Sequence, residues 1–493
     1  PAINPPPAVD LRLSPDKPLA MALVAEGAQQ VTDVYTPLGR LTVTRNRLAP
    51  YRQASGLSLT FEGKVSPQWG LFIDGEGFEP LPATTKGLEN GAFTHLDHLP
   101  EALAYRLLKR PRVLILDTPV MEALVRTFQQ EAVRVEVVLS NPGWRKLSTD
   151  PGLDMVGALF SSDGVQITYA DPRGTLRKGT SPYDLIVLGP PSPSALRADH
   201  GHTVEAFGDA LKRLSSSGLL AVSGPSDLPP RAGLRLLTTA VTALESHGAA
   251  APADHLIIIR SLRTVHMLIK KDTATSADIE AVRNFCRSRR FDPVWFPGMR
   301  PDEANRWNRF SQPYFHQAAR QLLGPDGHTF QKRYKFDLAP LTDDRPYFSH
   351  FLKPATLKEV LSLRGRGSLG MLSIAEPVLA ATLAQALGFS LLAVWLPLRR
   401  FRATRPTSAG TIETPPGGLF LLLGAGFMLA EFAVLEKLRL FLNEPVLAVG
   451  VTLAAFLALA GIGGGYSTRL MEVKKPVRRT IGLSTLGVMG MVL

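Results

Sequence analysis

The stretch RVLILDTPVMEALVRTF, residues 112–128, predicts a buried strand that runs directly into a helix. A strand followed by a helix opens doubly wound α/β domains, where a glycine-rich turn between the two brings backbone N–H groups close to a cofactor. This stretch contains no glycine. Asp117, Thr118 and Pro119 instead predict a cap followed by a proline at the first helical position. The stretch therefore predicts a cofactor-type fold without its cofactor loop.

Short apolar segments that alternate with helical patterns continue this arrangement along the chain. The alternation predicts a mostly parallel sheet covered by helices on both faces, which is a doubly wound, Rossmann-like α/β domain of residues 96–272. The further predicted strands are VRVEVVLS, VQITYA, YDLIVLG, GLLAVSG and HLIIIRS.

The regions beside this domain have other patterns. Residues 31–95 alternate apolar and polar side chains between Gly and Pro turns, which predicts a small antiparallel β module, and residues 1–30 are interpreted as a linker. Residues 273–370 are interpreted as a helical extension and membrane connector, with helices at 277–290 and 301–324. The chain begins without Met and ends inside an apolar run, so we expect the protein to continue at both ends.

Residues 371–493 are predicted to form a bundle of transmembrane helices. Residues 374–398, 417–435 and 445–465 are each apolar enough for a span, and a fourth, truncated span begins at residue 481. Basic residues follow the first and third spans, which places those loops in the cytoplasm and the soluble domain in the periplasm. Glu431 lies inside the second span, where we expect a helix contact rather than proton transfer or contact with a lipid headgroup.

The composition excludes several kinds of site and partner. Cys286 is the only cysteine, so an internal disulfide, a CxxC metal site and a CxxCH haem attachment are excluded. The net charge is +12, but no basic run interleaved with aromatic residues is present. We therefore expect a membrane and protein partners, and no nucleic acid.

Several stretches, in this order along the chain, resemble the bacterial membrane-embedded branch of the polyamine aminopropyltransferases, proteins similar to spermidine synthase. The resemblance implies an N-terminal β domain, a domain of the S-adenosylmethionine-dependent transferase type and flanking membrane helices, including an N-terminal membrane portion absent here. The stretches are SPDKPLAMAL, TPLGRLTV, GLFIDG, TVEAF, LPPR, FDPVWFPGMRPDEANRWNRF, KFDLAPLTDDRPYFSHF and FMLAEFAVLEKLRLFLNEPVLAV.

The cofactor positions that the resemblance implies are degenerate in this chain. Active members hold decarboxylated S-adenosylmethionine with a glycine loop, an acid for the ribose hydroxyls and a further Asp. Here the loop position carries Asp117 without glycine, and the position of the ribose acid carries Leu139, which cannot bind a diol. Asp171 matches the further Asp, but Pro172 follows it where a glycine is usual. We therefore expect no bound cofactor.

The catalytic positions that the resemblance implies have also changed. The family places two Asp residues after the strand that corresponds to YDLIVL, where they orient and deprotonate the attacking amine. The matching positions are Gly189 and Ser192, and neither side chain takes a proton from an amine at neutral pH. No Asp or Glu occurs between Asp184 and Asp199, so a shifted alignment does not restore the base.

Two other polar clusters could suggest chemistry. Asp199, His200 and His202 lie within four residues and could bind zinc or copper, but no distant fourth ligand is evident, so we expect packing histidines and no metal site. The stretch TDDRPYF supplies Asp343, Asp344 and Arg345 just before the predicted membrane region. We expect a structural ion pair or cap that ties the soluble domain to the bilayer face, rather than chemistry.

Two hypotheses of function follow. The first is a membrane-anchored, spermidine synthase-like pseudoenzyme that is non-catalytic and acts as a structural or binding subunit of a complex in the bacterial inner membrane. The second is an active aminopropyltransferase, or another S-adenosylmethionine-type transferase that acts on a small amine. The replaced positions and the periplasmic placement favour the first.

Overall fold

The computed structural model describes seven stretches of the chain: residues 13–84, 93–117, 119–193, 198–356, 375–403, 417–442 and 445–472. The chain divides into two compact units, Pro1–Leu383 and Ala384–Leu493. Each unit is considered separately below.

The first unit begins with the predicted antiparallel β module. Its four strands pair in chain order, and a two-residue Asp74-Gly75 turn with left-handed backbone joins the last two, as in tight hairpins. The range predicted as a linker also contains regular structure, because helix α1 (Pro18–Val24) precedes the sheet and the first strand starts at Ala28. The strands are β1 (Ala28–Thr36), β2 (Gly39–Asn46), β3 (Gln68–Ile73) and β4 (Glu76–Pro82).

The large sheet of the first unit is mixed and has eight strands in the order β12-β10-β11-β9-β8-β5-β6-β7. The five strands from β9 to β7 are parallel, whereas β11, β10 and β12 add antiparallel pairs at one end. All six predicted strands are present, and β11 and β12 are additional. The strands are β5 (Arg112–Leu116), β6 (Arg134–Leu139), β7 (Val165–Tyr169), β8 (Tyr183–Leu188), β9 (Leu214–Pro225), β10 (Leu256–Arg260), β11 (Thr264–Lys270) and β12 (Asp292–Trp295).

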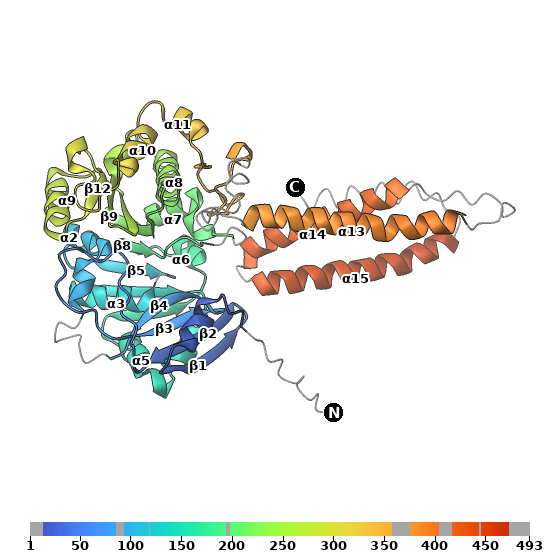
Figure 1. The fold of residues 1–493 in the computed structure, drawn as a ribbon, viewed down its shortest axis with the longest axis horizontal. Helices are drawn as coiled ribbons and strands as arrows, with labels where there is room; N and C mark the ends of the chain where they lie inside the picture. The colour runs from blue at the N-terminus through green and yellow to red at the C-terminus, as the bar shows by residue number, and fades with distance from the viewer. Residues whose placement is uncertain are drawn as a thin grey trace. The chain divides into compact units, whose positions relative to one another are not determined.

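Helices cover both faces of this sheet (Figure 1), as a doubly wound fold requires. One buried cluster joins the sheet to the β module and to α2, α3, α4, α5 and α9, and the other joins it to α6, α7, α8 and α10. The helices are α2 (Leu103–Leu107), α3 (Val120–Gln129), α4 (Gly143–Ser148), α5 (Asp154–Phe160), α6 (Pro172–Lys178), α7 (Val204–Arg213), α8 (Ala232–Ser246), α9 (Ser276–Arg289), α10 (Tyr314–Leu322) and α11 (Gly327–Arg333). Short 3₁₀-helices lie at η1 (Thr94–His98), η2 (Pro100–Ala102), η3 (Pro151–Leu153), η4 (His200–His202), η5 (Pro252–His255), η6 (Pro301–Glu303) and η7 (Pro354–Thr356).

The prediction of one long helix at 301–324 is wrong for the first half of that range. Within the range, only η6 and α10 are helical, and α10 begins at Tyr314. The cause is Asp292, whose side chain is fully buried. Its carboxylate accepts hydrogen bonds from the backbone N–H groups of Arg306 (2.5 Å), Trp307 (2.9 Å) and Asn308 (2.7 Å). These bonds hold the segment as a loop, because the same N–H groups can no longer join a helix.

The order of the parallel strands creates a switch point. The chain proceeds from β5 to β6 and β7 on one side, and then returns to place β8 and β9 on the other side of β5. The connections after β5 and β8 therefore diverge, and ligands of open α/β sheets bind in the crevice that such divergence leaves at the carboxyl ends of the strands.

The C-terminal unit contains long helices, but the predicted bundle of membrane spans is supported for one helix only. Among the residues described, Leu447–Tyr466 alone form a helix long and apolar enough to cross a membrane, with 20 residues and a mean hydropathy of 2.1. The apolar part of the first long helix, Val378–Ala393, is shorter. The fourth span, predicted from residue 481, lies outside the described residues. The helices are α13 (Ala375–Ala403), α14 (Gly417–Leu442) and α15 (Pro445–Glu472).

Candidate functional site

The residues at the predicted cofactor positions have structural roles. Asp117 follows β5 in a left-handed conformation, and its Oδ1 accepts a hydrogen bond from the backbone N–H of Ser140 at 2.9 Å, which connects the ends of β5 and β6. Leu139 is the last residue of β6 and is only 1% exposed in the core. Asp171 caps α6, because its carboxylate accepts from the backbone N–H groups of Arg173 (3.2 Å) and Gly174 (2.7 Å).

The N-terminus of α3 is occupied by a carboxyl group from the β module. The prediction placed Pro119 at the first helical position, but Pro119 is itself the N-cap residue and provides no side-chain hydrogen bond. Thr118, which was part of the predicted cap, lies outside the described residues. Glu79 of β4 supplies the acceptor instead, with its Oε1 2.6 Å from the backbone nitrogen of Val120. Burial raises the pKa of the Glu79 carboxyl to about 8. A backbone donor at the N-terminus of α3, the Val120 N–H, is thus engaged within the chain.

The residues at the predicted catalytic positions belong to a loop that a buried histidine holds. The imidazole of His202 lies between Asp199 Oδ1 (2.8 Å from Nδ1) and the carbonyl oxygen of Gly189 (2.9 Å from Nε2). The Ser192 backbone N–H donates to the other oxygen of Asp199 at 2.7 Å. Both partners of the imidazole are acceptors, so both ring nitrogens donate and the ring is the charged imidazolium.

The protonation of His202 follows from these partners. Burial opposes the charged ring, but the Asp199 carboxylate and the Gly189 carbonyl raise the pKa of His202 above its ordinary value. A raised pKa means that this contribution to stability is complete below the ordinary histidine value and is lost as the pH rises through the folded-state value. No cluster of three or more His, Cys, Asp or Glu side chains suited to a metal is found in the described part of the chain.

The motif around Asp343 is also part of this network. Asp343 Oδ1 lies 2.9 Å from Nη1 of Arg173, and it accepts a hydrogen bond from the Thr203 hydroxyl at 2.7 Å. Asp209 approaches the other terminal nitrogen of Arg173 at 3.0 Å. Asp343 therefore forms a structural ion pair, with Arg173 of α6 rather than with its neighbour Arg345.

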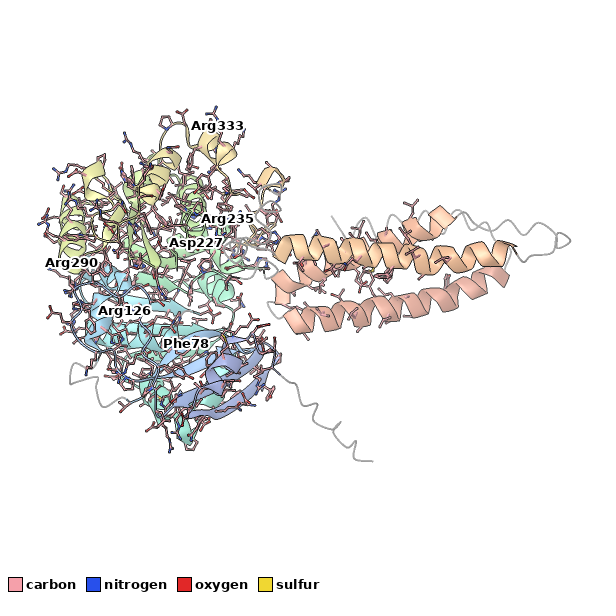
Figure 2. All side chains as sticks on the ribbon, in the orientation of Figure 1. Phe78, Arg126, Asp227, Arg235, Arg290 and Arg333 are labelled. Carbon is pink, nitrogen blue, oxygen red and sulfur yellow. The ribbon has the colours of Figure 1, made fainter. Side chains whose placement is uncertain are left out.

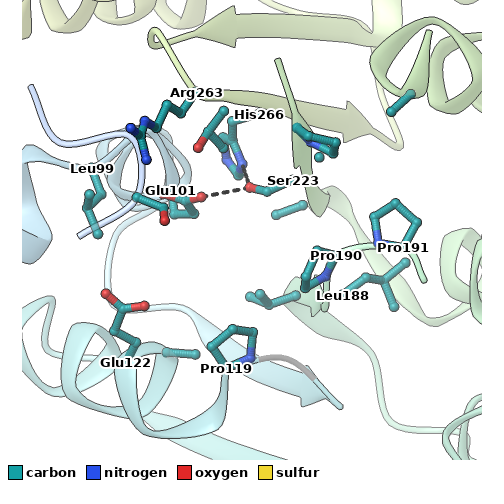
Figure 3. A pocket seen from close by; sticks show the side chains of 18 of the residues that line it. Leu99, Glu101, Pro119, Glu122, Leu188, Pro190, Pro191, Ser223, Arg263 and His266 are labelled. Carbon is teal, nitrogen blue, oxygen red and sulfur yellow. Dashed lines mark hydrogen bonds between the residues drawn. The ribbon is translucent and has the colours of Figure 1, made fainter. Parts of the chain in front are cut away.

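A cavity of about 640 Å³ lies beside the carboxyl ends of β8 and β9 (Figure 3). Its walls come from the β module, η2, α2, α3, the prolines after β8, and β9 and β11. Of the five positions predicted for the cofactor and the catalytic base, only Ser192 is among its lining residues. The main polar groups that line its inner part are Glu101, Glu122, Arg126, Ser223 and His266.

Three of these groups form a hydrogen-bonded chain. The Ser223 hydroxyl donates to Oε1 of Glu101 at 2.8 Å, and its oxygen lies 2.9 Å from Nδ1 of His266 (Figure 3). Because the hydroxyl proton is directed to Glu101, His266 donates from Nδ1. Burial lowers the pKa of His266 to about 4, so the imidazole is neutral near pH 7 and Nε2 carries a lone pair. This order, with serine between acid and imidazole, differs from a hydrolytic triad, in which the imidazole lies between the other two.

Glu122 and Arg126 extend from α3 into the same cavity. Burial raises the pKa of Glu122 to about 7, with the charge of Arg126 opposing the shift and that of Glu101 adding to it. The carboxyl group is therefore partly protonated at neutral pH and can donate a hydrogen bond.

The sequence analysis did not identify the polar residues that line the cavity. Glu101, Ser223 and His266 come from η2, β9 and β11, and their separation along the chain gives no local pattern. Glu122 and Arg126 had a detectable pattern, because they are charged residues four positions apart in an otherwise apolar helical stretch.

No family model and no curated protein matches the chain, whereas several solved structures are similar to it. One similar solved structure is a spermidine synthase in complex with the transition state analogue AdoDATO, with 11% identity, a TM-score of 0.32, and coverage of 62% of this chain and 86% of the other. The spermidine synthase from Thermotoga maritima has 12% identity, a TM-score of 0.32 and coverage of 62% and 87%. A putative methyltransferase from Escherichia coli has 11% identity, a TM-score of 0.24 and coverage of 39% and 89%. These similarities are distant.

Proposed function

We propose that this protein is a membrane-anchored, spermidine synthase-like pseudoenzyme that acts as a structural or binding subunit of a membrane protein complex. The observation that carries the proposal is the hydrogen bond from the Val120 backbone N–H to Glu79, which fills the N-terminus of α3 with a group of the chain itself. An adenosyl cofactor would have to displace this carboxyl group to reach the same donors.

The remaining positions support the same proposal. Leu139 offers no acceptor to a ribose, and a buried hydroxyl pair without an acceptor costs roughly 1–3 kcal/mol per unpaired group. The backbone carbonyl of Gly189 accepts a hydrogen bond from His202. Glycine has no side chain, so Gly189 cannot accept a proton from an amine. Binding and proton abstraction are therefore both impaired.

We expect the detergent-solubilised full chain to bind neither decarboxylated S-adenosylmethionine, S-adenosylmethionine nor methylthioadenosine with a Kd below about 100 μM, because the lost contacts weaken binding by several decades. Calorimetry with the three ligands measures this directly. Aminopropyl transfer to putrescine should not exceed that of a heat-killed sample, with the Thermotoga maritima spermidine synthase as the positive control. Transfer above the heat-killed level would refute the proposal in favour of an active transferase.

Membership of a complex is supported by Glu431 in α14. This residue is only partly exposed, and among the described residues its carboxylate has no hydrogen bond or ion pair. A carboxylate in an apolar membrane helix needs a polar partner, which a second membrane protein could supply. Copurification of a defined partner from native membranes, identified by mass spectrometry, tests this part of the proposal, and recovery of the chain alone contradicts it.

The proposal includes a membrane topology. Helix α15 anchors the chain in the bacterial inner membrane through Leu447–Tyr466, and the basic residues that follow this apolar stretch remain in the cytoplasm. The sheets and helices of the first unit then lie in the periplasm, away from the compartment in which adenosyl cofactors are made.

A cysteine introduced at the exposed position Ser217 of β9 should react with a membrane-impermeant maleimide in intact cells whose outer membrane is permeabilised. The unmodified chain is the matched control, because its single cysteine, Cys286, is buried and should not react. Labelling of Ser217→Cys only after the inner membrane is lysed would place the soluble unit in the cytoplasm.

A further inference from the structure

Arg126 carries a buried charge that the described part of the chain does not neutralise. Its side chain is 5% exposed and lines the cavity beside β8 and β9. Among the described residues it makes no ion pair and no side-chain hydrogen bond, and its Nε is buried without an acceptor. Buried guanidinium groups are normally paired, since removing a charge from water costs several kcal/mol.

The groups around Arg126 supply both donors and acceptors to the cavity. His266 is 2% exposed, and its Nε2, which has no partner in the described structure, carries a lone pair and accepts a hydrogen bond rather than donating one to a carboxylate. Glu122, one turn before Arg126 on α3, faces Arg126, Glu101 and Glu79, and its partly protonated carboxyl group can donate a hydrogen bond to an anion.

The lining and the volume of the cavity indicate the polarity and the size of the rest of the ligand. Apolar side chains make up much of the lining, and two further arginines belong to it. Arg231 is already paired with Asp227 at 3.2 Å, and Arg263 is exposed to solvent. The available space of about 640 Å³ accommodates a small organic molecule rather than a single inorganic ion. The apolar lining residues include Leu99, Ala104, Leu185, Val187, Leu188 and Phe351.

We infer that this cavity binds a small organic carboxylate, with the carboxylate group on Arg126 and the apolar body of the ligand against the aliphatic wall. A carboxylate matches the planar guanidinium group and can accept two of its hydrogen bonds. The inference goes beyond the proposed function, because it assigns a ligand site and does not depend on a partner protein or on the absence of aminopropyl transfer.

The test uses the detergent-solubilised full chain and the probes butanoate, hexanoate and octanoate, each below its micellar concentration, with the corresponding alcohols as neutral controls. We expect the carboxylates to raise the Tm of the wild type, because a ligand that binds the folded state stabilises it. In Arg126→Met the Kd for hexanoate should increase at least ~10-fold, since the charged hydrogen bonds are lost. Arg126→Lys should retain part of the binding.

Two further measurements separate a binding role from a packing role. Without ligand, Arg126→Met should melt about 2 °C or more above the wild type, because the buried unpaired charge is removed. Hexanoate should bind more tightly at pH 6 than at pH 8, as Glu122 loses its proton between them, and Glu122→Gln should remove most of this difference.

Equal shifts with acids and alcohols, no shift with any carboxylate, or unchanged hexanoate binding in Arg126→Met would each overturn the inference. Aminopropyl transfer by the wild type would refute the proposed function and leave these binding results unaffected.

Discussion

Replacing Arg235 of α8 with methionine is expected to lower the free energy of unfolding of the first unit by about 3–5 kcal/mol. The guanidinium group of Arg235 is buried at 2% exposure and donates to the backbone carbonyls of Phe348 (2.6 Å), Asp337 (2.7 Å) and His350 (2.7 Å). It also packs on the ring of Phe351, at 4.5 Å from the centroid. Methionine fills a similar volume but leaves these carbonyls without a donor, and each unpaired buried group is costly.

Denaturant unfolding of the full chain, followed by tryptophan fluorescence, measures the loss. The matched control is Arg333→Met, because Arg333 is an exposed arginine of the same unit, and this change should stay within about 0.5 kcal/mol of the wild type (Figure 2). Arg235→Lys should recover little, since one ammonium group cannot reach several carbonyls in the geometry of the planar fork. A loss below about 1 kcal/mol in Arg235→Met would show that other groups hold the segment.

Arg235 stabilises a segment of the chain that also lines the cavity. The carbonyls that it binds belong to residues 337–350, and Phe348, Ser349 and Phe351 of the adjoining sequence line the cavity. The Ser349 hydroxyl also donates to the carbonyl of Ser192 at 2.8 Å, in the loop after β8. A buried charge on α8 therefore fixes one wall of the proposed ligand site.

The elements predicted correctly are those whose pattern is local. Each of the six predicted strands is an apolar run bounded by polar or turn residues, and burial on both faces of a sheet produces that pattern without information from elsewhere. The strands β11 and β12 were missed because β11 contains His266 and Lys270 in its apolar run and β12 is only four residues long. The loop around Asp292 was missed because its carboxylate acts on N–H groups 14 to 16 residues away.

For the candidate site, the sequence predicted only which cofactor-binding residues are missing. The missing glycine and Leu139 were visible in the sequence because the resemblance assigned each a position. The carboxyl group at the N-terminus of α3 could not be found in this way, since Glu79 lies 41 residues before Val120, on β4 of the small sheet. The hydrogen-bonded chain from Glu101 to His266 likewise depends on contacts between distant segments.

Replacing Glu79 with glutamine is expected to stabilise the protein increasingly as the pH rises. Burial raises the pKa of Glu79 to about 8 in the folded state from an ordinary value of 4.5. A raised carboxyl pKa gives a contribution to stability that is complete below 4.5 and is lost as the pH rises through about 8. At ~1.4 kcal/mol for each pH unit between the two pKa values, the loss by pH 9 is on the order of 5 kcal/mol. Glutamine keeps an oxygen acceptor for the Val120 N–H and does not titrate, so Glu79→Gln avoids this loss.

The measurement is the free energy of unfolding of wild type and Glu79→Gln at several values between pH 5 and pH 9. We expect the two proteins to be similar near pH 5 and to differ by several kcal/mol at pH 9, with the variant more stable. Glu76→Gln on the same strand is the matched control, because Glu76 is 71% exposed in its side chain and should shift stability little and evenly across this range. A constant difference between Glu79→Gln and the wild type would mean that Glu79 is already ionised in the folded protein. The N-terminus of α3 would then hold a carboxylate anion, which would exclude an anionic ligand more strongly than a neutral acid does.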